Sequence, residues 1–315
     1  MKKTKQVSIL LAWILLVTCV NTPLIFAGND AYTVTYNHHI EKGELEVMFM
    51  NDFTHPSKHL QEEDGQKDYF SNMVELEYAP WDQLASEFMV EWFEELNTGK
   101  TGFTGFRYET RYRLFKDEVP LNPMVYAEYE DLDPRSRFKM VTSGWVNPPY
   151  MTGDEAKPDR ESILETRLIL SQDFGHWNVA FNWINETDFH ASGKTDFGYA
   201  LGVSYFLHEK REETDEDDHD AKTNKSDTKG STQGAHCHAP LEGQAFIRPA
   251  ALAFELYGGL GDTVRFGVDP ARQEHYFQPS VMFHIGKNAM LSLGFAIGLT
   301  RSSDQMVRTS LGWEF

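Results

Sequence analysis

Val307-Arg308-Thr309-Ser310-Leu311-Gly312-Trp313-Glu314-Phe315 is the stretch of sequence that decides the fold. Its odd-numbered positions are mostly apolar or aromatic, and its even-numbered positions are small or charged. Because successive side chains of a β-strand point to opposite faces, this period of two predicts a strand with one apolar and one polar face. A tilted strand of about ten residues is long enough to cross a membrane.

The same alternation recurs along the whole chain, and helical periodicity is scarce. In residues 73–78, Val74, Leu76 and Tyr78 oppose Glu75 and Glu77. In residues 291–299 the residues opposite the apolar face are all small, from Ser292 to Gly298. We predict about twelve antiparallel strands that close into one transmembrane β-barrel over residues 44–315. The strands are expected to begin near Glu44, Phe70, Leu84, Gly102, Pro123, Ser162, Trp177, Phe197, Phe246, His275, Ala289 and Gln305.

Connections between these segments alternate in length. Residues 79–82, 173–176 and 286–288 are tight turns, whereas residues 54–69, 131–161 and 258–274 are long and polar. Short periplasmic turns and long extracellular loops are typical of outer-membrane barrels. A soluble β-sandwich also alternates apolar and polar faces. Tryptophans near the expected strand ends favour the barrel, since aromatic girdles lie at both membrane interfaces; they are Trp81, Trp92, Trp177 and Trp313.

The first residues predict export. Lysines at positions 2, 3 and 5 precede an apolar run from Val7 to Val20, and Ala27 follows. This pattern indicates a signal peptide over residues 1–27, and residues 28–43 are then expected to form a periplasmic lead-in. A retained signal anchor and a lipoprotein attached at Cys19 are alternatives, but Thr18 is an unusual residue before a lipoprotein cysteine. The expected location is the outer membrane of a Gram-negative bacterium, with outer-membrane lipid as a partner.

Charge and cysteine content exclude some functions. The net charge is −19, and residues 1–27 contribute three lysines and no acid, so the mature chain is more acidic still. Such a chain lacks the cationic surface that nucleic acid binding requires. With Cys19 in the signal peptide, Cys237 remains alone, which excludes an internal disulfide.

Charged residues are concentrated on the face that the barrel would turn inward. They form a candidate lumen network of Glu75, Glu77, Glu87, Glu91, Arg107, Glu109, Arg111, Arg113, Glu128, Glu130, Glu165, Arg167 and Glu186. We expect Glu87 and Glu91 to face Arg107 and Arg111 across a strand pair. Two interpretations remain open: a pore whose lining selects small solutes, preferably cations, or a structural or sensory barrel with a self-plugged lumen.

Residues 209–240 form an acidic insert without apolar residues other than alanines and Cys237. Its composition predicts disorder, and counting strands from the C-terminus places it on the periplasmic side. His219, His236, Cys237 and His238 are candidate ligands for zinc or copper, with weak divalent binding expected. No other cofactor is predicted, and we expect a non-enzyme. A hydrolase remains open, and it requires a Ser or Asp beside a rim histidine.

The sequence carries two resemblances to known families, one general and one narrower. The signal peptide, the alternating strands and the final strand ending at Phe315 resemble bacterial outer-membrane barrels, whose terminal aromatic residue is read by the barrel-assembly machinery. More narrowly, Glu109–Phe115 and Pro123–Glu130 are similar to segments of poorly characterised transporter-like barrels near the phenol meta-cleavage pathway family. That resemblance implies an outer-membrane transporter and no established catalytic residues.

Overall fold

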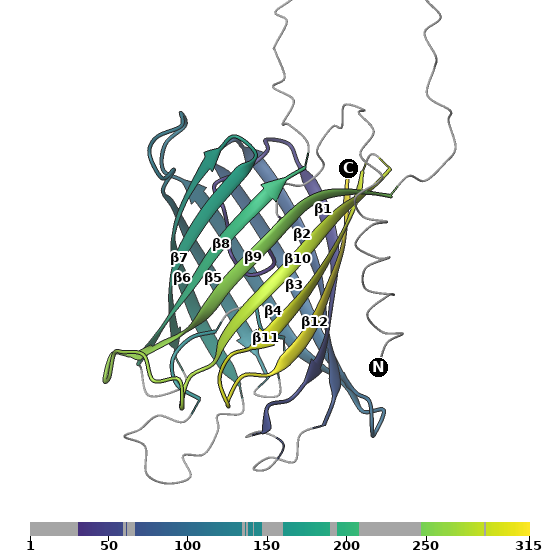
Figure 1. Ribbon diagram of the computed structural model, residues 1–315, viewed down its shortest axis with the longest axis vertical. Coiled ribbons are helices and arrows are strands. Elements are labelled where there is room, and N and C mark those ends of the chain that lie inside the picture. Colours follow the sequence, from purple (N-terminus) through teal and green to yellow (C-terminus); the bar gives the residue numbers. More distant parts are fainter. Residues whose placement is uncertain are drawn as a thin grey trace, which may run out of the picture.

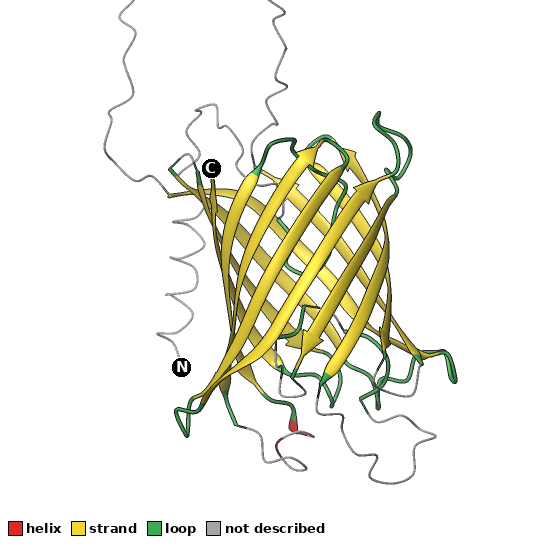
Figure 2. Cartoon of the chain, turned by 180° about the vertical axis from the view of Figure 1, so that it is seen from behind, coloured by secondary structure: helices red, strands yellow, loops and turns green. Residues whose placement is uncertain are grey.

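In the computed structural model, the described residues form twelve antiparallel strands (Figure 1), and Figure 2 shows the same barrel from behind. The structure describes residues 31–58, 61, 67–133, 136, 138–140, 142–146, 160–189, 194–207, 247–286 and 288–315. Each strand begins within two residues of its predicted start. Their bounds are β1 Leu45–His55, β2 Tyr69–Trp81, β3 Leu84–Glu95, β4 Thr101–Arg113, β5 Met124–Leu132, β6 Glu161–Phe174, β7 Trp177–Asp188, β8 Thr195–Phe206, β9 Ile247–Asp262, β10 His275–Ile285, β11 Ala289–Gly298 and β12 Gln305–Glu314.

The barrel is closed because β1 pairs with both β2 and β12. Val47 lies opposite Trp313 on one side and opposite Leu76 on the other. Every other strand pairs with its neighbours in chain order. Closure leaves no strand edge without a hydrogen-bonding partner, a condition that any sheet inside a bilayer must meet. The predicted closed twelve-strand barrel is therefore confirmed.

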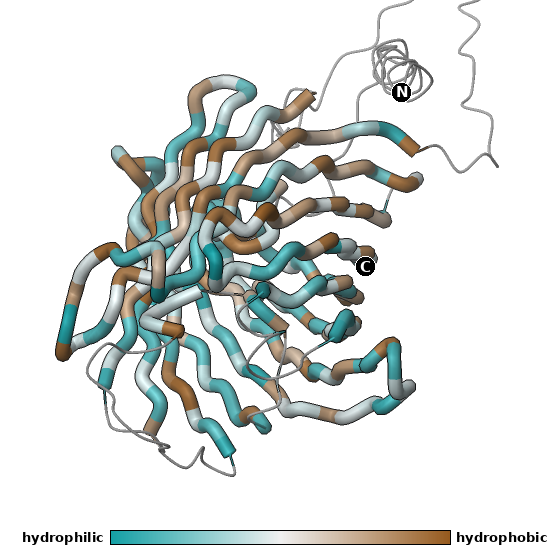
Figure 3. The backbone as a smooth tube through the Cα atoms, turned by 60° about the horizontal axis from the view of Figure 1, so that its bottom comes forward, coloured by the Kyte–Doolittle hydropathy of each residue, from teal (hydrophilic) through white to brown (hydrophobic). Residues whose placement is uncertain are grey.

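The outer face of the barrel is apolar, and hydrophobic and hydrophilic positions alternate along the strands (Figure 3). Among the described residues, no helix has the length and apolarity needed to span a membrane. A continuous belt of exposed aromatic and aliphatic side chains is unstable in water and is covered by lipid in a membrane barrel, in agreement with the predicted outer-membrane location. The belt includes Phe49, Leu76, Phe88, Tyr108, Val125, Leu168, Leu201, Phe254, Phe277, Phe295 and Leu311.

The two ends of the barrel differ. Three short turns, after β2, β6 and β10, lie at the same end as the C-terminus (the upper end in Figure 1). We call this the periplasmic end, following the rule that short turns face the periplasm. Trp81, Trp177 and Trp313 lie near this end and are exposed, as expected of an interfacial girdle.

One predicted loop is shorter than expected. Residues 258–274 were expected to form a loop, but β9 continues to Asp262. The strand carries glycines at 258, 259 and 261, which allow close approach of other segments. A Cβ atom on Gly259 would lie 2.5 Å from the carbonyl oxygen of Gly144.

Two segments lie inside the barrel. Residues 31–40, here the lumen segment, enter from the periplasmic end. Residues 138–140 and 142–146, here the inner loop, enter from the opposite end. The sequence predicted a lead-in over residues 28–43 but did not predict that residues 31–40 enter the lumen. The small inward residues of β8 make this room: a Cβ on Gly202 would lie 2.5 Å from the ring of Tyr32, and one on Gly198 would lie 2.4 Å from the carbonyl oxygen of Thr142.

Candidate functional site in the lumen

The lumen segment is held to the barrel wall by polar side chains. The carboxylate of Glu255 on β9 accepts hydrogen bonds from the backbone N–H groups of three consecutive residues, Thr33, Val34 and Thr35, at 2.7–3.0 Å. Asn182 on β7 accepts one from the N–H of Tyr36 and donates one to its carbonyl oxygen, both at 2.8 Å. These contacts satisfy backbone groups that would otherwise be buried without partners.

Apolar contacts complete the packing of this segment. Val34 packs with Ile184, Ala200 and Tyr257. Tyr32 packs in a cluster with one alanine of β7, Ala180, and three of β9, Ala250, Ala251 and Ala253. The tyrosine hydroxyl donates to Asn178 Oδ1 at 2.9 Å. The segment therefore has both the polar and the apolar contacts of a core element, although it is not part of the sheet.

Tyr36 enters the predicted charge network. Its ring lies between two guanidinium groups, with the Cζ atoms of Arg111 and Arg167 each 4.8 Å from the ring centroid. Its hydroxyl donates a hydrogen bond of 2.7 Å to Glu109. Arg167 also donates to the carbonyl oxygen of Val34 at 3.0 Å. The two arginines thus bind the lumen segment as well as the acids of the wall.

The predicted pairs across β3 and β4 are diagonal. Directly opposite Glu87 lies Glu109, and opposite Glu91 lies Gly105. Ion pairs nevertheless form between Glu87 and Arg111 and between Glu91 and Arg107, the latter at 3.1 Å. Long side chains bridge the offset, because diagonal neighbours in a sheet lie within their reach.

Two buried arginines organise most of the predicted network. Arg107 pairs with Glu128 at 3.1 Å and with Glu130 at 2.9 Å, in addition to Glu91. Arg111 pairs with Glu77 at 2.5 Å and with Glu109 at 3.2 Å, in addition to Glu87.

Other predicted members of the network lie beside these two groups or apart from them. Arg167 pairs with Glu165 on the same strand. Glu186 accepts a hydrogen bond from Ser143 of the inner loop. Arg113 lies at the end of β4, where it donates to the carbonyl oxygen of Lys116 at 3.0 Å.

A second charged group, missed by sequence reasoning, holds the inner loop. Lys139 pairs with Glu274 at 2.7 Å and with Asp304 at 2.8 Å. Burial alone would lower the pKa of Lys139, but Glu274, Tyr276 and Asp304 raise it well above its usual value. Arg308 of β12 pairs with Asp52 at 3.0 Å and donates to the carbonyl oxygen of Lys139. Alternation places Asp52 and Arg308 on the inner face, but no local pattern shows that Lys139 enters the barrel.

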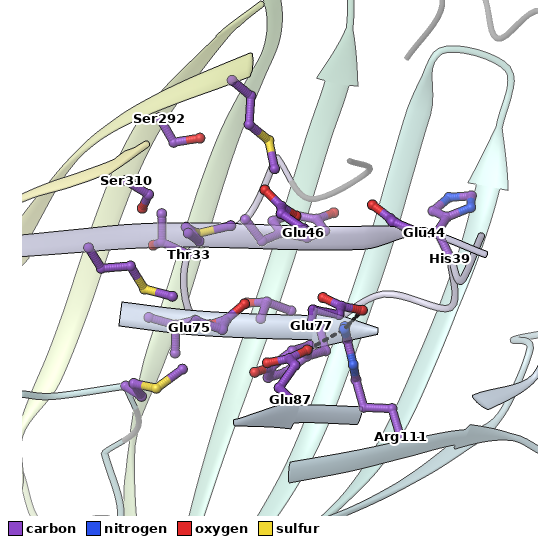
Figure 4. A pocket seen from close by; sticks show the side chains of 18 of the residues that line it. Thr33, His39, Glu44, Glu46, Glu75, Glu77, Glu87, Arg111, Ser292 and Ser310 are labelled. Carbon is purple, nitrogen blue, oxygen red and sulfur yellow. Dashed lines mark hydrogen bonds and ion pairs between the residues drawn. The ribbon is translucent and has the colours of Figure 1, made fainter. Parts of the chain in front are cut away.

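Between the lumen segment and the wall lies a pocket of about 80 Å³ (Figure 4). Its lining carries six carboxylates and one guanidinium, that of Arg111. Met140 of the inner loop also lines it, and Met140 packs with Met50, Met73, Met89 and Phe138. The carboxylates belong to Glu41, Glu44, Glu46, Glu75, Glu77 and Glu87.

Glu44, just before β1, shows the effect of this crowding. Burial, followed by the nearby charges of Glu77, Glu41, Glu46 and Glu314, raises the pKa of Glu44 to about 9. Acidic groups outnumber the single guanidinium in this pocket, and those that are ionised attract cations to this end of the lumen.

A Ser, a His and an Asp meet beside the lumen segment, as the hydrolase alternative requires. Ser171 Oγ lies 2.5 Å from His38 Nδ1, and His38 Nε2 lies 3.8 Å from Asp173 Oδ2. Ser171 is 1% exposed, and its Oγ already accepts a hydrogen bond from the His38 N–H. The pocket described above is lined by His39 but by neither His38 nor Ser171. A nucleophile needs access to its substrate, so this arrangement does not favour acyl transfer.

The remaining sequence-predicted sites lie outside the described residues. They are the signal peptide and the four candidate ligands of the insert, His219, His236, Cys237 and His238. Phe206 and Ile247, where β8 ends and β9 begins, lie at the periplasmic end. Metal binding by the insert stays a prediction.

Comparison with known proteins gives structural likeness only. Neither family models nor curated proteins match the chain. An outer membrane channel from Pseudomonas putida F1 is similar over 91% of this chain and 100% of its own, with 10% identity and a TM-score of 0.45. The NanC porin is similar over 85% of this chain and 100% of its own, with 6% identity and a TM-score of 0.43. Outer membrane phospholipase A from Escherichia coli is similar over 89% of this chain and 97% of its own, with 10% identity and a TM-score of 0.37.

Channels and an enzyme thus occur among these structures, and at such identities and TM-scores they carry no argument about function. The narrower resemblance to barrels of the phenol meta-cleavage group and the role of Phe315 in assembly stay predictions.

Proposed function

We propose that this protein is an outer-membrane channel for small cationic solutes, kept closed by its lumen segment. The observation that carries the proposal is the attachment of that segment: one carboxylate, Glu255, accepts hydrogen bonds from the N–H groups of Thr33, Val34 and Thr35. Residues 31–40 do not pair as a strand with the wall, so they can leave without opening the sheet. Cation preference follows from the acids that line the pocket at the periplasmic end, where five carboxyl groups besides Glu44 lie around the one guanidinium of Arg111.

A self-plugged structural barrel is the second candidate, and the inner loop favours it. Lys139 ties that loop to Glu274 and Asp304, so the lumen is filled from both ends. The two candidates differ in one respect: a channel conducts when the lumen segment is released, whereas a structural barrel does not. No catalytic step belongs to either function.

Planar-bilayer conductance of the refolded mature chain separates the candidates. Glu255→Ala removes the acceptor for three N–H groups, so we expect more frequent openings than in the wild type and a reversal potential that indicates cation selectivity. Glu94→Ala, which removes the same charge from an exposed position near the end of β3, is the matched control and is expected to behave as the wild type.

Release of the segment is measured separately. In a chain carrying Cys237→Ser, a cysteine introduced by Thr35→Cys reports exposure through its rate of maleimide labelling. If Glu255→Ala increases labelling but not conductance, the protein is a structural barrel and the channel proposal is wrong.

A further inference from the structure

Two histidines of the lumen segment converge on one carboxylate of the wall. The Nε2 atom of His39 lies 3.2 Å from Asp173 Oδ2, and that of His38 lies 3.8 Å from the same oxygen. The imidazole centroids are 4.3 Å apart. Neighbouring side chains of a regular extended chain point in opposite directions. Here the chain bends at His38, and Asn37 Oδ1 accepts a hydrogen bond of 2.8 Å from the N–H of His39.

We propose that His38, His39 and Asp173 bind a divalent transition-metal ion, with zinc as the representative, at the periplasmic end of the lumen. One donor atom from each residue lies within 4.8 Å of the other two. Ligands about 2.0–2.2 Å from a tetrahedral zinc ion are separated by slightly more than 3 Å, so the observed 3.2 and 3.8 Å need only a small adjustment.

Groups behind these side chains orient them for a metal. With its proton on Nδ1, His38 donates to Ser171 Oγ, and its Nε2 lone pair is directed to the shared site. Asn178 Nδ2 donates to Asp173 Oδ1 at 2.6 Å and leaves Oδ2 facing the two imidazoles. Metal-bound histidines and carboxylates characteristically have such outer hydrogen-bond partners.

The donor set and its exposure decide the kind of ion. Two imidazoles and one carboxylate suit zinc and its neighbours, whereas calcium and magnesium require six or more oxygen ligands. The side chain of Asp173 is 29% exposed, so water or a solute can complete the coordination. Since the histidines belong to the lumen segment and the carboxylate to β6, a bound ion would fasten that segment to the wall. The site does not depend on whether the lumen conducts.

Zinc titration of the refolded full chain, followed by calorimetry, tests this site. The background carries His219→Ala, His236→Ala, Cys237→Ala and His238→Ala, so that the insert does not contribute. We expect one zinc ion per chain and no comparable binding of calcium. His39→Ala and Asp173→Asn are each expected to weaken zinc binding at least tenfold. Ser171→Ala is expected to weaken it about 10-fold or more through the orientation of His38.

His176→Ala is the matched control, because His176 lies on the neighbouring turn and contacts the carbonyl oxygen of Phe206 instead. Its zinc affinity is expected to equal that of the background chain. Unchanged affinity in both His39→Ala and Asp173→Asn would overturn the site, as would equal weakening by His176→Ala.

Cobalt substitution of the background chain gives a readout that needs no ligand variant. Intense visible bands of four-coordinate cobalt support the site, and the weak bands of hexa-aqua cobalt overturn it. Heat-modifiable migration on gels shows that each variant is folded.

Discussion

At the scale of single residues, Tyr36 connects the lumen segment to the charge network. Its ring lies between Arg111 and Arg167, and its hydroxyl donates to Glu109. Buried guanidinium and carboxylate groups are costly unless each finds partners. The tyrosine supplies a hydrogen-bond donor to one acid and an aromatic face to two bases, so the network and the lumen segment stabilise each other.

Replacement of Tyr36 separates these contributions. Tyr36→Phe keeps the ring and removes the hydrogen bond to Glu109, so we expect a loss of about 1.5–3 kcal/mol in the free energy of unfolding. Tyr36→Ala also removes the ring and leaves a cavity, with an expected loss of about 3–5 kcal/mol. Denaturant unfolding of the refolded barrel measures both. Equal stability of the two variants would show that the ring contributes nothing to the packing between the arginines.

Glu44 predicts a dependence of stability on pH. Its pKa is about 9 in the folded protein, against 4.5 as its ordinary value, because of burial and the surrounding acids. The stabilising contribution of its neutral form is therefore complete below pH 4.5 and is lost as the pH rises to about 9. Glu44→Gln keeps a neutral side chain at every pH. We expect the variant to gain stability relative to the wild type between pH 5 and pH 9, measured by denaturant unfolding. A difference that does not vary with pH would contradict the raised pKa.

At the scale of elements, the small inner face of β8 determines what the lumen contains. Gly198 lies against the inner loop and Gly202 against Tyr32, and Ala200 lies between them. The outward residues of the same strand, such as Leu201, are large and exposed to lipid. Large and small side chains thus alternate along β8. Its outer face contacts the membrane, and its inner face leaves room for the lumen segment and the inner loop.

Gly198→Ala tests the contact of this strand with the inner loop. The added Cβ would lie 2.4 Å from the carbonyl oxygen of Thr142, a backbone atom, so the loop has to move. With Thr142→Cys as a label site in the Cys237→Ser chain, we expect faster maleimide labelling when alanine is present at 198. Leu201→Ala, on the lipid face, serves as control and leaves labelling unchanged. Labelling at the wild-type rate in Gly198→Ala would mean that the loop does not rest on β8.

The alternation that predicts strands is a local pattern. It therefore identified the start of each strand to within two residues and the inward position of the arginines. The small inner residues were also visible in the sequence, but the segments that fill the space beside them were not. Tyr32, Val34 and Tyr36 make up too short a stretch to be recognised as a core element, and Lys139 lies in a long polar connection. Their positions depend on contacts with residues more than 100 positions away, such as that of Thr35 with Glu255.

At the scale of the whole molecule, the barrel consists of a closed wall and two inserted segments with different attachments. The wall has a continuous ladder of backbone hydrogen bonds and an apolar outer belt. The lumen segment is joined to it covalently only through residues 41–44 at the start of β1, and otherwise by side chains. Local opening is expected where few cooperative backbone hydrogen bonds exist, so the lumen segment should move before the wall does.

Deletion of residues 31–40, followed by block with a peptide of the same sequence, tests the central claim most directly. The measurement is single-channel conductance of the refolded deletion variant in a planar bilayer. We predict a steady, cation-selective conductance absent from the full chain, which the peptide blocks when it is added from the periplasmic side. A folded deletion variant that conducts no more than the full chain, or a current that the peptide does not reduce, would contradict the proposal that this segment closes the lumen.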